Sequence, residues 1–104
     1  MHLSPTEEDR LLVFAAAELA RRSLGAGLSL SAPEATALVA DEMHQAARRG
    51  EGLDGVLDAG RNAVLRERLM DGVVEIVGEV RVEVLLDDGR RLAVVRPWDG
   101  DADA

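Results

Sequence analysis

The spacing of apolar residues changes along this chain, from the period of a helix to the period of a strand. In the first part they recur at helical spacing, as Leu38, Val39 and Met43 do. From Val80 and Val82 onward they alternate with polar residues, which is the two-residue rhythm of a strand. This order predicts an α+β fold, with an N-terminal bundle of about three to four helices followed by a C-terminal antiparallel β-hairpin.

The length of the chain limits it to one domain. With 104 residues it has room for a single modest core. We expect one domain over residues 1–98. The last six residues, 99–104, are small and acidic, so we expect them to form a disordered tail.

Two helix starts carry clear capping signals. Ser4 is followed by a proline and, three residues after the cap, by Glu7. Ser31 and Glu34 repeat this pattern, and they predict a second helix that ends near Gly50. A third, shorter helix is expected at about 53–65.

The end of the chain predicts strands. Residues 73–77 could add a further strand. Asp88-Gly89 is a turn signal between the two strands of the hairpin. A two-residue loop would place Leu86 opposite Arg91, whereas a three-residue loop would place Leu86 opposite Leu92, and the second register is preferred because it pairs more apolar residues.

The first helix is apolar around its whole circumference over residues 11–17. A helix of this kind needs cover on all sides, and a chain of this size has few layers to provide it. Part of the first helix is therefore expected to face another subunit. Trp98 permits two interpretations, a plug over the domain or an anchor in a partner.

The residues for catalysis or metal binding are scarce. The chain has no cysteine, its only histidines are His2 and His44, and all twelve of its cationic residues are arginines. A solvated helix residue is the favoured interpretation of His44, against a metal ligand or general base. We therefore expect no catalytic, metal-binding or cofactor-binding residue on this chain.

Charge and hydropathy exclude two classes of partner. The net charge of −8 disfavours binding to nucleic acid. The longest apolar run has seven residues, far fewer than the roughly 20 that cross a bilayer. The acidic opening of the sequence differs from a secretory signal, so a cytoplasmic protein is expected.

Several short motifs, in this order, resemble the urease gamma subunit family. They extend from residue 1 to about residue 96 and are Met1-His2-Leu3-Ser4-Pro5, Pro33-Glu34-Ala35, Ala46-Ala47-Arg48, Met70-Asp71-Gly72-Val73 and Asp88-Gly89. The sequence departs from the family pattern at Val74 and at Arg96-Pro97-Trp98, as in a diverged member or paralogue.

The resemblance implies a noncatalytic small subunit of a urease-type nickel hydrolase. Its expected partners are beta-like and alpha-like urease subunits in a homotrimeric arrangement, with nickel on the alpha subunit. The alternative is a stand-alone interaction module that has lost its urease association. Candidate residues for the subunit interface are Leu11, Leu12, Phe14, Met70, Val73, Val82, Val84 and Trp98.

Overall fold

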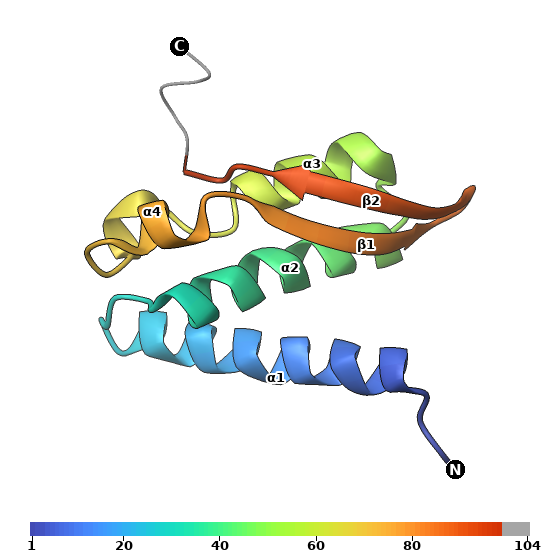
Figure 1. Cartoon of the computed structure of the whole chain (residues 1–104), viewed down its shortest axis with the longest axis horizontal. Coiled ribbons are helices and arrows are strands. Elements are labelled where there is room, and N and C mark those ends of the chain that lie inside the picture. The colour runs from blue at the N-terminus through green and yellow to red at the C-terminus, as the bar shows by residue number, and fades with distance from the viewer. Residues whose placement is uncertain (99–104) are drawn as a thin grey trace.

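The computed structural model describes residues 1–98 as an α+β arrangement in which α2 is the central element. α2 lies between α1 on one side and the hairpin with α3 on the other (Figure 1). The elements in chain order are α1 (Pro5–Gly25), α2 (Ala32–Arg48), α3 (Gly52–Arg61), the 3-10 turn η1 (Arg66–Arg68), α4 (Val73–Val77), β1 (Val80–Leu86) and β2 (Gly89–Val95). This confirms the predicted order of helices followed by an antiparallel hairpin.

The capping signals of the sequence form as predicted. At the start of α1 the backbone N–H of Glu7 donates to Ser4 Oγ at 3.2 Å, and Glu7 Oε1 accepts from the Ser4 N–H at 2.8 Å. Ser31 and Glu34 form the same capping box at the start of α2. Each box provides hydrogen-bond acceptors for two backbone N–H groups at the helix start, those of the serine and of the glutamate. Both helix starts are therefore fixed by local contacts.

Two elements differ from the prediction. α3 ends at Arg61, whereas the apolar pattern suggested about residue 65. Residues 73–77 form the short helix α4 and not a strand. α4 is flanked by Gly72 (φ +85°) and Gly78 (φ +62°), whose backbone conformations let the chain turn sharply into and out of one helical turn. The expectation of a strand at this place was therefore wrong.

The hairpin adopts neither of the two registers considered from the sequence. Leu86 pairs with Gly89, Val84 with Arg91 and Val82 with Ala93, so the turn is Asp87-Asp88. The buried residues of β2 are Ala93 and Val95, while Leu92 and Val94 face outward.

In this register the buried residues of both strands lie on the same side of the hairpin, toward the helices. The hairpin packs its inward side on α2 and α3, and β2 approaches α3 closely at Gly60. The register expected from the sequence was chosen by the number of apolar pairs within the hairpin, a criterion that does not take the packing on α3 into account.

Trp98 is a plug over the domain. Its side chain is buried, and the indole N–H donates to the carbonyl oxygen of Val64 at 3.0 Å. Arg66 Nη1 donates to the carbonyl oxygen of Trp98 at 3.3 Å. The two contacts fix the end of the domain against the segment after α3. The predicted acidic tail, 99–104, lies outside the described residues.

Gly60 is expected to be intolerant of a side chain. A Cβ at this position would lie 2.8 Å from Met43 Sδ and 3.1 Å from Val95 Cγ2, and both of these side chains are buried. Gly60→Ala is expected to lower the free energy of unfolding by about 1–3 kcal/mol, although alanine favours helices. Gly25→Ala, which meets no atom within 4 Å, is the matched control in urea denaturation. Equal stability of the two variants would contradict this packing.

Candidate subunit interface

The structure separates the eight predicted interface residues into two groups. Leu11, Leu12, Phe14 and Met70 are exposed, so they are available to a partner. The other four lie in the core of the chain itself, and they are Val73, Val82, Val84 and Trp98. The valines of β1 face α2. Their alternation along the strand therefore marks the inner side of the hairpin and not a docking surface. The interface prediction therefore retains only the exposed group.

α1 is covered on one side only. It packs on α2 through Ala17 and Ala20, which are completely buried. Figure 1 shows α1 as an outer layer of the molecule. Leu11, Leu12 and Leu19 all remain more than half exposed. The sequence predicted cover from another subunit for Leu11 and Leu12, and this remains a prediction.

A groove bounded by three helices adds to this exposed surface. The groove, which we call the α1–α4 groove, has a volume of about 640 Å³. Its lining is almost entirely apolar and comes from α1, α2, α4 and the residue before β1: Leu12, Val13, Ala16, Ala32, Pro33, Thr36, Ala37, Ala40, Ile76, Val77 and Glu79. Leu12 is 67% exposed and Ile76 is 73% exposed, so large apolar side chains stand at its rim.

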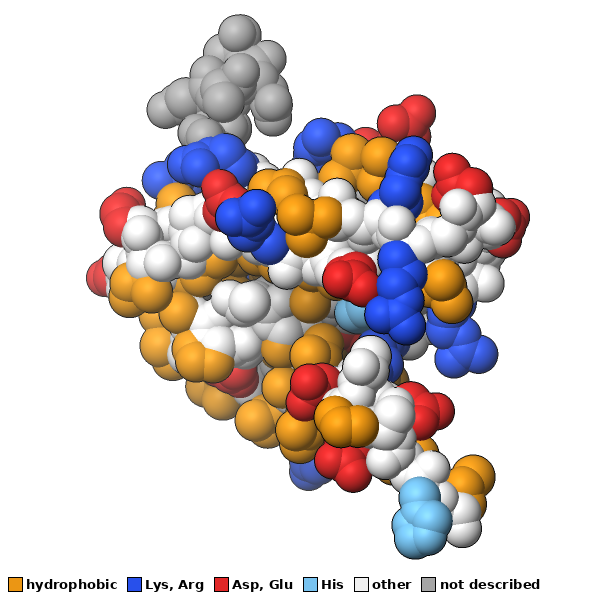
Figure 2. All heavy atoms as spheres, turned by 45° about the vertical axis from the view of Figure 1, so that its right-hand side comes forward, with side chains coloured by type: hydrophobic (Ala, Val, Ile, Leu, Met, Phe, Trp, Pro, Cys, Tyr) orange, Lys and Arg blue, Asp and Glu red, His pale blue; other side chains and the backbone are white. Residues whose placement is uncertain are grey.

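Ile76 was missed from the sequence because its segment was assigned to a possible strand. In the helical turn of α4, Val73 is buried while Ile76 projects outward. The space-filling view shows apolar side chains gathered along the lower left of this face, whereas arginines lie mainly along its top and right (Figure 2).

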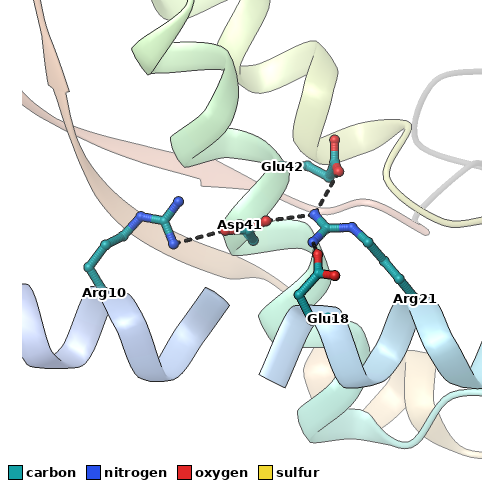
Figure 3. A network of polar contacts seen from close by, with 5 residues as sticks. All are labelled: Arg10, Glu18, Arg21, Asp41 and Glu42. Atoms are coloured by element: carbon teal, nitrogen blue, oxygen red, sulfur yellow. Dashed lines mark hydrogen bonds and ion pairs between the residues drawn. The ribbon is translucent and has the colours of Figure 1, made fainter. Parts of the chain in front are cut away.

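An ionic network centred on the buried Asp41 joins α1 to α2 (Figure 3). Asp41 of α2 is completely buried, and Arg21 Nη2 donates to its Oδ2 at 2.6 Å. Arg10 Nη1 lies 2.8 Å from Asp41 Oδ1, an ion pair whose angles fall outside hydrogen-bond geometry. Arg21 also binds Glu42 at 2.9 Å and contacts Glu18. Burial by itself lowers the pKa of Arg21, but the hydrogen bonds to Asp41, Glu42 and Glu18 outweigh it and raise this pKa above its ordinary value.

His44 lies one turn after Asp41, in a second groove between α1, α2 and the hairpin. This groove has a volume of about 440 Å³ and is lined by residues such as Leu3, Arg10 and Leu85. Burial lowers the pKa of His44, and the positive charge of Arg10 lowers it further, while Asp41 acts in the opposite direction. His44 is therefore half-buried and is not the fully solvated residue expected from the sequence.

The stability of the domain is expected to fall on mild acidification because of His44. Its pKa is lowered from 6.5 in the folded chain, so the unfolded chain takes up this proton first as the pH falls. The contribution of His44 to the free energy of unfolding is complete above about pH 6.5, the unfolded pKa. It is lost as the pH falls through the pKa of His44 in the folded chain. Urea denaturation at pH 7.5 and 5.5 measures the difference. His44→Gln is expected to remove most of it, and an unchanged pH dependence in this variant would contradict the assignment.

The described residues do not fit a metal centre. Between residues 1 and 98 no three histidine, cysteine or acidic side chains stand close enough together to hold a metal ion. The sequence contains no cysteine and only two histidines. None of the helices in this part of the chain is long and apolar enough to cross a membrane.

These features define a class of protein. A small α+β domain with large exposed apolar side chains on its outer helices is typical of a subunit that assembles with other chains. The comparison with known families then identifies the particular family. The chain belongs to the urease gamma subunit family, whose model matches residues 1–97.

Similar proteins from several bacteria agree with this family. The chain is 44% identical over 95 residues to a urease subunit gamma of Saccharopolyspora erythraea, covering 91% of this chain and 95% of that protein. A urease subunit gamma of Ruegeria sp. is 42% identical over the same shares of both chains. A urease subunit gamma/beta of Streptomyces coelicolor is 50% identical over 91% of this chain, which spans only 42% of that protein. Nothing in these comparisons supports the alternative of a stand-alone interaction module.

Proposed function

We propose that this chain is the noncatalytic small subunit of a urease-type hydrolase, which converts urea to ammonia and carbamate. In this role it binds beta-type and alpha-type chains in a trimeric assembly, and the nickel chemistry resides on the alpha-type chain. The observation that carries the proposal is the family match over residues 1–97. A cytoplasmic location, predicted from the sequence, is part of this proposal.

The surface of the domain supports an assembling role. Leu11, Leu12, Phe14 and Met70 are exposed, and the α1–α4 groove places further apolar surface beside Leu12. Burying one large aliphatic side chain contributes roughly 1.5–3 kcal/mol, so a partner that covers several of them gains substantial binding energy. The arginine network between α1 and α2 keeps this surface in one arrangement before the partner arrives.

The noncatalytic role is tested with the purified chain. Incubation with nickel and urea is expected to release no ammonia above the rate of a protein-free control. The same assay on a complex that also contains the beta-type and alpha-type chains is expected to release ammonia. Turnover by this chain alone, in proportion to its concentration, would contradict the proposal.

A further inference from the structure

The outward side of α1 carries a row of residues that is symmetric in chemistry about its middle. It lies on the side of the helix opposite to Ala17 and Ala20, which pack on α2. All of its members are exposed, and we call it the α1 stripe: Glu8, Leu11, Ala15, Leu19 and Arg22. The stripe is separate from the α1–α4 groove, whose α1 residues are Leu12, Val13 and Ala16.

Helix geometry places the stripe residues on one line. Glu8, Ala15 and Arg22 are spaced by seven residues, which is close to two turns of an α-helix. Leu11 and Leu19 lie four residues to either side of Ala15, one turn above and below it. Read from either end, the stripe gives a charged residue, a leucine, an alanine, a leucine and a residue of opposite charge.

We propose that two copies of this chain associate through the α1 stripe, with their α1 helices antiparallel about a twofold axis at Ala15. In this arrangement Glu8 of each copy faces Arg22 of the other, and Leu11 faces Leu19. A twofold contact requires a surface that is complementary to itself, and the stripe meets this requirement in both charge and apolar character. The small side chain of Ala15 lets the two helices approach closely at the axis.

The charges at the two ends of the α1 stripe support a second copy of this chain as the partner that covers it. Within residues 1–98 the side chains of Glu8 and Arg22 form no ion pair or hydrogen bond. Their neighbours Arg10 and Arg21, on the side toward α2, are engaged in the network around Asp41. Among the described residues, Glu8 and Arg22 are thus unpaired charges of opposite sign at the two ends of the outward side, where an antiparallel copy supplies the opposite sign to each.

The inference does not depend on the proposed function, since it concerns the chain by itself. In a trimeric assembly the same twofold contact would join two trimers face to face. It is tested by sedimentation velocity on the purified full chain over a range of concentrations. The expected result is a reversible dimer of twice the 11.1 kDa chain mass, which dissociates more readily at high salt.

Charge reversal distinguishes this contact from nonspecific association. Glu8→Arg or Arg22→Glu alone is expected to weaken self-association by about tenfold, since each replaces two symmetric attractions by repulsions. The double variant E8R/R22E restores opposite charges across the axis and is expected to recover the dimer. Circular dichroism checks that α1 stays helical in each variant. Failure of the double variant to recover, with its helix intact, would overturn the inference.

A cysteine at the axis gives a second measurement. The chain has no native cysteine, so Ala15→Cys introduces a single thiol beside its own symmetry mate. Mild oxidation is expected to link two copies in high yield, whereas Asp54→Cys, on the exposed side of α3, is expected to link few. Equal yields from the two variants, or a monomer at all concentrations, would overturn the inference. A monomeric chain that still joins the beta-type and alpha-type chains would leave the proposed function intact.

Discussion

Replacing Leu12 and Ile76 together by aspartate is expected to prevent assembly with the partner urease chains. Both side chains are largely exposed at the rim of the α1–α4 groove. A partner that covers them gains roughly 1.5–3 kcal/mol from each, and a carboxylate in their place adds a desolvation cost. We therefore expect affinity to fall by on the order of 100-fold or more, measured as the amount of beta-type and alpha-type chain retained by the tagged variant.

The isolated double variant is expected to remain folded. Surface substitutions away from packed or capped positions usually change the free energy of unfolding by about 0.5 kcal/mol or less. Leu92→Asp is the matched control, since Leu92 is 57% exposed but lies on the outward side of the hairpin. The groove is excluded as an interface if the double variant, still folded, retains the partner chains as well as the unaltered protein does.

Arg21→Met is expected to cause the largest loss of stability among the surface arginines. Asp41 is completely buried, and its hydrogen-bonded contact in the network is with Arg21. Removing that partner leaves a buried carboxylate with only the less well aligned Arg10, and breaking a buried ion pair costs about 3–5 kcal/mol. We expect a loss near the lower end of this range, about 3 kcal/mol, in urea denaturation.

Two further variants test the cause of that loss. Arg61→Met removes an ion pair with the exposed Asp58, so it is expected to cost about 0.5 kcal/mol or less. Adding Asp41→Leu to Arg21→Met removes the uncompensated charge and is expected to recover at least half of the lost stability. Equal losses for Arg21→Met and Arg61→Met would show that the buried carboxylate has no special role.

Local signals in the sequence predicted the elements that depend on local chemistry. The capping boxes at Ser4 and Ser31 form within four residues of chain, so both helix starts could be predicted correctly. The hairpin was predicted for the same reason, because alternation and a turn signal are short-range features.

Features that depend on a third element could not be predicted in this way. The inward residues of the hairpin pack on α2 and α3, with Val95 close to Gly60, and a sequence pattern does not show which helix will lie there. The same limit explains why Val82, Val84 and Trp98 were assigned to an interface although they fill the core. The role of Asp41 could not be predicted from the sequence, because nothing local indicates that two arginines from α1 reach it.

The subunit role is tested most directly by native mass spectrometry of the complex purified through a tag on this chain. The tagged chain is co-expressed with the beta-type and alpha-type urease chains of the same organism. The account predicts one copy of this chain for each beta-type and each alpha-type chain, in a complex that hydrolyses urea. A fully active complex of the other two chains that contains no copy of this chain would contradict it.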